Sequence, residues 1–134
     1  MHVNNLNLAR PIVVKKLWGY EKHLVNTQLY CGKILVAVPN GMACSIHYHK
    51  LKTETFHILN GRLHLQLFTL EGTLVQEMEL SPGDTLTLIP LTPHRFWATD
   101  EVCEFLEVST HDAPEDSYRL VDSGPIPASP EGAR

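Results

Sequence analysis

Short apolar segments separated by turn residues are the feature of this sequence that most restricts its fold. Apolar side chains do not follow helical spacing over any stretch of ten or more positions. Instead, apolar runs recur at intervals of roughly 8 to 12 residues and are divided by turns such as Pro39-Asn40-Gly41 and Ser81-Pro82-Gly83-Asp84. We predict strands over residues 13–18, 29–38, 43–49, 55–59, 63–69, 73–80, 85–89, 94–98 and 102–108. This pattern predicts an all-β fold, namely a small antiparallel jelly-roll β-barrel.

The length and composition fit one folded domain followed by a short tail. The chain has 134 residues, of which 43% are hydrophobic and 19% charged, which is enough apolar material for an ordinary core. We place the domain at residues 1–121. Residues 122–134 hold three prolines and two glycines but only one large apolar side chain, Ile126. We expect this tail to be extended or disordered unless a partner subunit covers it.

Charge, cysteine content and the N-terminal segment exclude several classes of protein. The net charge of -4 includes no basic run that would follow a phosphate backbone, so we expect no nucleic-acid partner. Asn4, Asn5 and Asn7 interrupt the N-terminal segment where a secretory signal would be apolar, and no segment approaches the ~20 apolar residues of a membrane span. The three cysteines lack a paired spacing. We therefore expect a cytoplasmic protein with no membrane partner.

The dipeptide Asn60-Gly61 lies between two alternating runs and predicts a two-residue β-hairpin. In that register His57 is opposite His64, and the two flanking runs share their faces. One face carries Glu54, Phe56, Ile58, Leu63, Leu65 and Leu67, and the other carries Thr55, His57, His64 and Gln66. The prediction therefore points the carboxylate of Glu54 into the apolar interior and both histidines away from it.

A buried carboxylate needs a partner, and the nearby histidines suggest a metal ion as that partner. His47 and His49 are two residues apart, so on one strand their side chains leave the same face. With Glu54 and the distant His94 they form a set of three imidazoles and one carboxylate. This donor set suits a divalent transition metal with positions left for substrate. The alternative is a hydrogen-bonded polar core in a barrel that has lost its metal.

The segment from Gly41 to Gly61 resembles the first sequence motif of the cupin family, G-x5-H-x-H-x4-E-x6-G, and matches it at every defined position. The second cupin motif, G-x5-P-x-G-x2-H-x3-N, is matched at Gly83 and His94 only. Ile89, Leu91 and Ala98 occupy its Pro, Gly and Asn positions. The resemblance implies a small β-barrel with one divalent metal ion (Zn, Mn, Fe, Ni or Co) held by His47, His49, Glu54 and His94. The departures concern the shape of the turn before His94.

Within the cupins, the chain is most similar to the mannose-6-phosphate isomerase-like branch. The similar segments are Leu17-Trp18-Gly19-Tyr20-Glu21, Cys31-Gly32-Lys33-Ile34-Leu35, Leu106-Glu107-Val108-Ser109-Thr110 and Asp116-Ser117-Tyr118-Arg119. The resemblance implies a metal-dependent isomerase that interconverts aldose and ketose forms of a sugar or sugar phosphate. Glu107 and Lys33 are the candidate catalytic residues for moving the proton.

Two other functions remain open at this point. A metal-dependent cupin dioxygenase would use the same donor set with a redox-active metal and would consume oxygen. A non-catalytic cupin would bind a sugar or other small ligand without turnover, because a fold alone does not determine function. We also expect a homodimer, since the strand near Ile12 to Val14 and the Pro-rich tail lack local partners.

Overall fold

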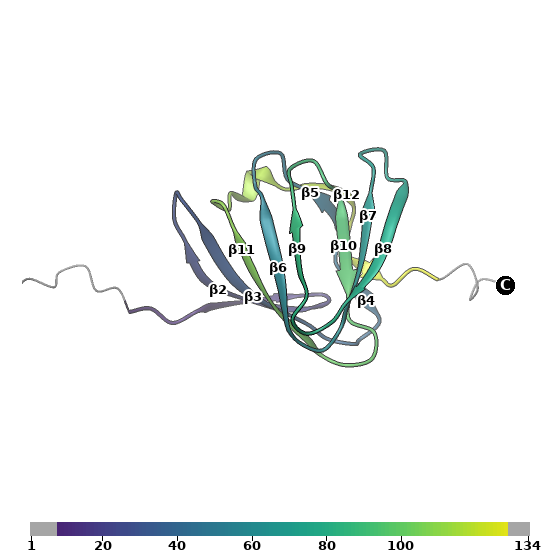
Figure 1. Cartoon of the computed structure of the whole chain (residues 1–134), viewed down its shortest axis with the longest axis horizontal. Helices are drawn as coiled ribbons and strands as arrows, with labels where there is room; N and C mark the ends of the chain where they lie inside the picture. The colour runs from purple at the N-terminus through teal and green to yellow at the C-terminus, as the bar shows by residue number, and fades with distance from the viewer. Residues whose placement is uncertain (1–7, 129–134) are drawn as a thin grey trace, which may run out of the picture.

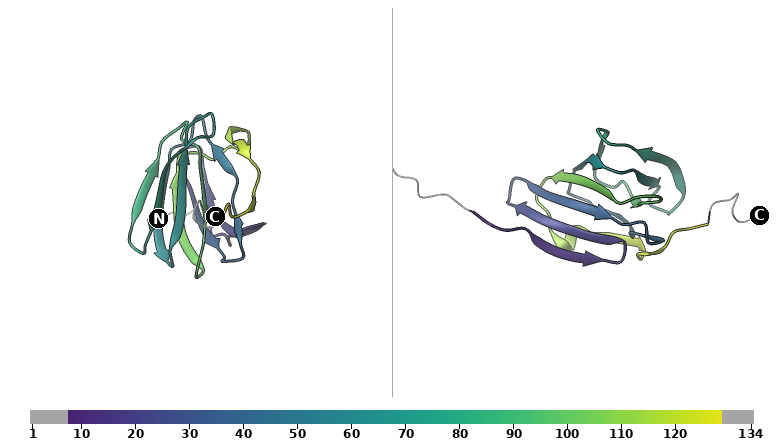
Figure 2. Two further views of the ribbon diagram at one scale, coloured as in Figure 1. Left: turned by 90° about the vertical axis from the view of Figure 1, so that its right-hand side faces the viewer. Right: turned by 90° about the horizontal axis from the view of Figure 1, so that it is seen from below.

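The computed structural model describes residues 8–128 as a jelly-roll barrel built from two antiparallel sheets, as the sequence predicts. Figure 1 shows the strands running side by side around a common interior, and Figure 2 shows the two layers from the side and from below. The six-stranded sheet has the order β1-β2-β3-β11-β6-β9, and the five-stranded sheet has the order β12-β5-β10-β7-β8. A third, two-stranded pair joins β13 to β4.

Most strand bounds follow the predicted ranges, with additions at both ends of the chain. The predicted strand over 43–49 is wrong, because residues 44 and 45 interrupt it and its two parts pair in different sheets. The six-stranded sheet contains β1 (Ile12–Lys16), β2 (Gly19–Asn26), β3 (Cys31–Ala37), β11 (Cys103–Ser109), β6 (Glu54–Asn60) and β9 (Thr85–Leu88). The five-stranded sheet contains β12 (Tyr118–Val121), β5 (Ile46–Tyr48), β10 (His94–Trp97), β7 (Leu63–Phe68) and β8 (Leu74–Leu80). The short pair is β4 (Met42–Ala43) with β13 (Gly124–Pro125), and the 3-10 turn η1 spans Pro114–Asp116.

Strands β2 and β12 lie outside the predicted ranges, because neither has the alternation of buried and exposed residues that marks a half-buried strand. No residue of either strand is fully buried. The tail was expected to be extended or disordered unless a partner subunit covers it. Its first part is extended and forms the short strand β13. Directly after this strand, the amide of Ile126 donates to the carbonyl of Gly41 at 2.9 Å. Residues 129–134 lie outside the described residues, as does the segment 1–7, in which we expected no secretory signal.

Within residues 8–128, no helix is long and apolar enough to cross a membrane.

Aromatic side chains from both sheets fill the closed end of the barrel. Phe56 and Phe105 of the six-stranded sheet pack edge to face with 5.1 Å between their ring centroids. Phe96 of the five-stranded sheet packs edge to face on Phe105 and on Trp18, with centroid distances of 5.2 Å and 4.9 Å. Each is buried, and edge-to-face pairs add about 1 kcal/mol to the free energy gained by burying their area. This packing joins the two sheets and fixes the floor on which the polar residues described below rest.

The predicted hairpin at Asn60-Gly61 is wrong, although its faces are correct. β6 pairs with β11 and β9, whereas β7 pairs with β10 and β8, so the turn leads from one sheet to the other. His57 lies opposite Thr85 and Leu106, and His64 lies opposite Trp97 and Glu79. A tight turn signal specifies the change of direction but does not specify which strands pair. The faces survive because side-chain alternation depends only on each strand itself. Glu54, Phe56, Ile58, Leu63 and Leu65 are all buried.

Gly61 generates a stability prediction, because it combines a left-handed backbone with a close approach. Its φ is 73°, and a Cβ there would overlap the backbone carbonyl of Val102. Gly83 has a similar φ of 94° but faces open space. We expect Gly61→Ala to lower the free energy of unfolding by about 3 kcal/mol or more, against about 1 kcal/mol for Gly83→Ala, measured by urea denaturation. Equal losses for the two variants would contradict the close approach at Gly61.

Candidate metal centre

Three histidines from one sheet and its following loop converge at the open end of the barrel. His47 lies in β5 and His94 in β10, and the two residues are directly paired across these antiparallel strands. His49 follows β5 by one residue. One ring nitrogen from each of the three lies within 4.8 Å of the others, an arrangement that could hold a metal ion. The structure therefore brings together the three histidines that the sequence pattern selects.

The other ring nitrogen of each histidine contacts a backbone carbonyl. Nδ1 lies 3.0 Å from the Ser45 carbonyl in His47, 2.7 Å from the Asp116 carbonyl in His49 and 2.8 Å from the Thr92 carbonyl in His94. A carbonyl oxygen only accepts, so Nδ1 carries the proton in all three rings. In its neutral form each ring therefore has an unprotonated Nε2, which is the form that binds a metal.

The turn before His94 has a left-handed residue at the glycine position of the second motif. Leu91, at the glycine position of that motif, has a φ of 66°, the left-handed conformation that glycine adopts without strain. Its amide donates to the carbonyl of His49 at 2.7 Å. The backbone of this turn is thus tied directly to one of the three converging histidines.

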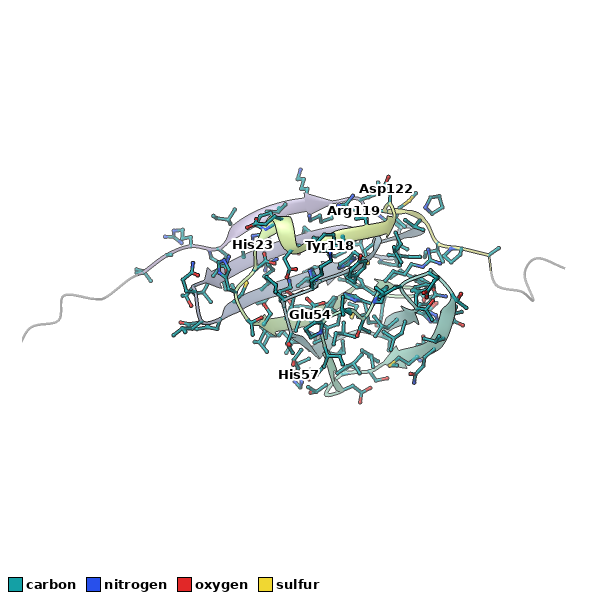
Figure 3. The ribbon with its side chains drawn as sticks, turned by 90° about the horizontal axis from the view of Figure 1, so that it is seen from above. His23, Glu54, His57, Tyr118, Arg119 and Asp122 are labelled. Atoms are coloured by element: carbon teal, nitrogen blue, oxygen red, sulfur yellow. The ribbon has the colours of Figure 1, made fainter. Side chains whose placement is uncertain are left out.

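Glu54 completes the polar cluster from the opposite sheet, as predicted. Its carboxylate lies 3.0 Å from Nε2 of His94 and 3.5 Å from Nε2 of His49, and the residue is only 2% exposed. Figure 3 shows Glu54 in the middle of the barrel, whereas His57 lies at its outside. Oε1 of Glu54 and Nε2 of His94 face each other, yet neither has a hydrogen-bond partner among the described residues. Within residues 8–128, their only polar contact is this ion pair at 3.0 Å, which lacks hydrogen-bond geometry, so both atoms are available to a cation that would take the place of the proton.

The electrostatics of the cluster favour neutral rings at His47 and His49 and, in the absence of a metal, a proton on His94 beside the ionised carboxylate of Glu54. Burial, together with the proximity of His94, lowers the pKa of His47 to about 3. Burial also lowers the pKa of His49. Burial raises the pKa of Glu54, but His94 and Lys52 outweigh it and hold that pKa below its usual value. Burial opposes a charge on His94, yet its contact with Glu54 raises the pKa of this ring.

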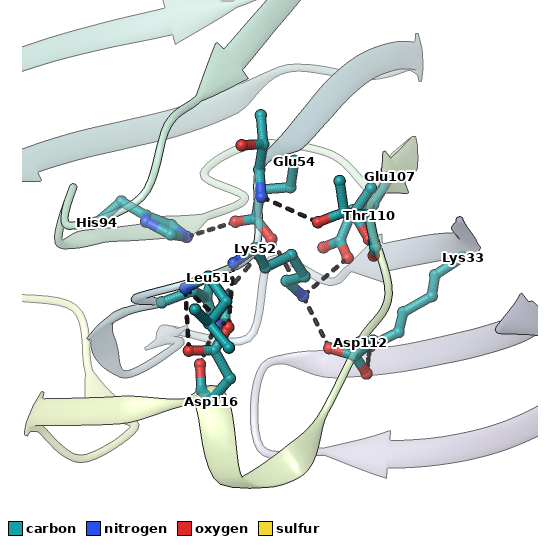
Figure 4. Close-up of polar contacts among 12 residues, drawn as sticks. Lys33, Leu51, Lys52, Glu54, His94, Glu107, Thr110, Asp112 and Asp116 are labelled. Carbon is teal, nitrogen blue, oxygen red and sulfur yellow. Dashed lines mark hydrogen bonds and ion pairs between the residues drawn. The ribbon is translucent and has the colours of Figure 1, made fainter. Parts of the chain in front are cut away.

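Lys52 is a buried residue of this site that the sequence patterns missed. Its ammonium group lies 2.9 Å from Asp112, 3.3 Å from Glu54 and 3.5 Å from Glu107, as Figure 4 shows. The residue is 4% exposed. Lys50 and Lys52 both lie in the short loop between His49 and Glu54 of the first motif, and sequence alone does not show which of them turns inward.

The two candidate catalytic residues lie on adjacent strands of the same wall. Glu107 of β11 and Lys33 of β3 are directly opposite each other. Burial and the charge of Glu54 raise the pKa of Glu107 to about 7, against the opposing charges of Lys52 and Lys33. The ammonium of Lys33 lies 3.0 Å from Asp112 and 4.0 Å from Glu21. Burial lowers the pKa of Lys33, but Glu107 and Asp112 raise it above its usual value overall.

These groups line one cavity of about 270 Å³. Its lining includes His47 and His49 of the three converging histidines, together with Glu54, Glu107, Lys33 and Lys52. The segment after β11 forms another part of the wall through Asp112, Ala113, Pro114 and Ser117. This volume is below the ~300–1,000 Å³ of pockets for drug-sized molecules, so the cavity suits a small polar ligand.

The two histidines predicted to face away from the cavity make outer contacts. His57 contacts the hydroxyl of Thr85 at 2.8 Å. His64 stacks on Trp97 with 4.4 Å between ring centroids and contacts Glu77 at 3.1 Å. Their separation from the cluster is correct, although they are not the cross-strand neighbours that the hairpin required.

Known proteins share both the fold and part of the sequence. A D-lyxose/D-mannose isomerase of Thermosediminibacter oceani is 33% identical, and the match covers 68% of this chain and 61% of that protein. The chain thus spans about three fifths of the length of this relative.

Among solved structures, an oxalate decarboxylase of Lactobacillus farciminis in a formate complex matches 89% of this chain and 38% of its own, at a TM-score of 0.72 and 21% identity. The capsular polysaccharide assembling protein CapF of Staphylococcus aureus matches 85% of this chain and 33% of its own, at a TM-score of 0.74 and 15% identity. At these identities the likeness shows the shared fold alone.

The family comparison agrees with the geometry of the barrel. Residues 34–109, more than half of the chain, match the cupin domain family. This match extends from β3 to the end of β11 and includes the three histidines and Glu54. The chain therefore belongs to the cupin family.

Proposed function

We propose that this protein is a metal-dependent sugar isomerase that interconverts an aldose and its ketose. The observation that carries the proposal is the position of Glu107. This buried carboxylate has a pKa near 7 and an oxygen without a hydrogen bond, 3.5 Å from the ammonium of Lys52. It lines the same cavity as His47 and His49, two of the three histidines able to hold a metal. Aldose–ketose isomerisation needs both elements, namely a base that carries a proton and a cation near the sugar oxygens.

His47, His49, His94 and Glu54 are the residues that would hold the metal. Their donor set of three imidazoles and one carboxylate suits a divalent transition metal such as Zn, Mn, Fe, Ni or Co. When bound, such an ion polarises the oxygens on adjacent sugar carbons and stabilises the negative charge that develops on them. The protein contributes fixed imidazoles, because each ring is anchored through Nδ1 to a backbone carbonyl.

Glu107 is the better of the two candidate bases. As a carboxylate it would accept the proton from C2 of the aldose and return it to C1. A pKa near the working pH favours both steps. Lys33 is held protonated by Asp112 and Glu107, so it has no lone pair with which to take a proton. We assign Lys33 to neutralising the carboxylates of the wall.

Two kinds of substrate deserve testing. The sequence resemblance implied mannose 6-phosphate, whereas the relative from Thermosediminibacter oceani is a D-lyxose/D-mannose isomerase. Both lead to a small polyhydroxylated aldose, and the cavity of about 270 Å³ is in keeping with a monosaccharide. We therefore propose a sugar or sugar phosphate as the partner molecule.

The metal site predicts about one divalent ion per chain. Replacement of His49 by Ala should lower metal content sharply, because it removes one donor nitrogen. His57→Ala is the matched control, since this histidine lies outside the cavity and should leave metal content unchanged. Elemental analysis of the purified protein and titration with Zn²⁺ measure both. Absence of binding in the wild-type protein by both methods would contradict the site.

The isomerase activity predicts proton exchange with solvent. The metal-loaded protein should convert D-mannose, D-lyxose or mannose 6-phosphate to the ketose in deuterated water, with deuterium appearing at C1 or C2. NMR detects both products. Oxygen consumption instead of isomerisation would identify the dioxygenase alternative, and tight sugar binding with neither reaction would identify a binding protein.

Glu107 predicts both a rate loss and a pH dependence. Glu107→Gln should lower kcat by about 10²- to 10⁴-fold, because the amide cannot take a proton. Glu104→Gln on the same strand is the control, since its carboxylate contacts Asn60 on the outside. In the wild-type protein, kcat/KM should rise with pH as Glu107 ionises, with a midpoint at or below about 7, because a cation beside Glu54 offsets one cause of the raised pKa. A profile that falls over this range would contradict the assignment.

We also propose that the protein is a homodimer. β1 is an edge strand, and its residues Ile12 and Val13 are 68% and 57% exposed, which leaves an unpaired apolar edge. Light scattering should give about twice the mass of the 15.1 kDa chain. A mass near that of one chain at all concentrations would exclude the dimer.

A further inference from the structure

Asp116 lies outside the donor set, yet its side chain organises the loop between two of the donor residues. It is buried in the turn η1, and its Oδ1 accepts hydrogen bonds from the amides of Lys50 at 2.9 Å and Leu51 at 3.2 Å. Its Oδ2 accepts from the amides of Leu51 at 3.2 Å and Lys52 at 3.0 Å. One carboxylate thus satisfies three successive backbone amides, a concave arrangement that favours an anion. Figure 4 shows Asp116 below this loop.

The backbone of Asp116 contacts the donor set directly. Its carbonyl accepts the Nδ1 proton of His49 at 2.7 Å. The side chain therefore holds the loop that leads from His49 to Glu54, while the main chain of the same residue fixes the orientation of the His49 ring. These contacts bridge 64 to 67 residues of sequence, so they form only when the segment after β11 has docked on the barrel.

The loop that Asp116 holds also carries the buried ammonium group. The amide of Lys52 donates to Asp116, and the side chain of Lys52 reaches Glu54 and Glu107. A shift of this loop would move His49, Lys52 and Glu54 together, since they are consecutive parts of one short connection. The carboxylate of Asp116 is the group placed to prevent that shift.

We propose that Asp116 is a positioning residue of the metal centre, whose carboxylate sets metal affinity without touching the ion. The proposal rests on the proposed function, because it assumes that the three histidines and Glu54 hold a divalent metal. Partners that orient metal ligands change metal affinity by about 10- to 100-fold when they are removed. Asp116 differs from such a partner in acting on a whole loop as well as on one ring.

The test compares Zn²⁺ affinity in Asp116→Asn with that in the wild-type protein and in Asp84→Asn. An Asn at position 116 keeps the size of the side chain but turns an NH₂ group toward an amide that needs an acceptor. Asp84 also caps a loop, accepting from the amide of Ser81 at 2.7 Å, but outside the cavity. We expect Asp116→Asn to weaken Zn²⁺ binding 10- to 100-fold in competition with a chromophoric chelator, well below the melting temperature of each protein. Asp84→Asn should bind as the wild type does.

The outcomes separate this inference from the function on which it rests. A folded Asp116→Asn that binds Zn²⁺ as tightly as the wild type, even with a lower melting temperature, would make Asp116 merely structural and overturn the inference. A wild-type protein that binds no Zn²⁺ would instead overturn the metal centre.

A second measurement on the wild-type protein covers the case in which the variant does not fold. If order in this loop raises Zn²⁺ affinity, bound Zn²⁺ must in turn stabilise the ordered loop. Zn²⁺ should therefore slow hydrogen exchange at the amides of Lys50, Leu51 and Lys52 at least tenfold and leave that of Ser81 unchanged. Unchanged exchange at the three loop amides would overturn the inference.

Discussion

The burial of the Glu54 carboxylate is the constraint around which the open end of this barrel is arranged. A carboxylate that is 2% exposed must be compensated, because an unpaired buried charge costs several kcal/mol. The structure supplies Lys52 at 3.3 Å on one side and His94 at 3.0 Å on the other. Lys52 in turn draws Asp112 and Glu107 into the cluster. The charged wall of the cavity therefore follows from one inward-facing residue of β6.

The cavity combines two chemically different walls because the two sheets contribute different residues. The five-stranded sheet supplies His47 and His94, whose rings are neutral or share a proton with Glu54. The six-stranded sheet supplies Glu54 and Glu107, together with the balancing ammonium of Lys33. A ligand in the cavity would contact donors of both kinds. A buried carboxylate with a pKa near 7 can lie close to one held ionised because His94 contacts Glu54 and lowers its pKa, whereas the charge of Glu54 raises the pKa of Glu107.

Sequence reasoning predicted the parts of the site that depend on local periodicity. Alternation along β6 was sufficient to place Glu54 inward and His57 outward. It was insufficient for strand pairing, since Asn60-Gly61 turns from one sheet to the other instead of closing a hairpin. Lys52 and Asp116 escaped prediction because both belong to irregular segments, and they meet across 64 residues of chain. A loop has no regular alternation of inward and outward side chains. Tertiary contacts therefore decide which of its side chains turns inward.

The position of the centre between the two sheets links metal binding to closure of the barrel. Glu54 approaches His94 only when the sheets pack face to face over the aromatic floor of Phe56, Phe96 and Phe105. An ion held by donors from both sheets would therefore bind the closed barrel in preference to an opened one, and its binding free energy would add to the stability of the fold. Before the ion binds, Glu54 and His94 stabilise each other as an ion pair, so the closed form is already favoured. This pairing would have to be given up if His94 bound an ion through Nε2. The affinity of such a centre would reflect the exchange of a proton for a metal, and it should weaken as pH falls.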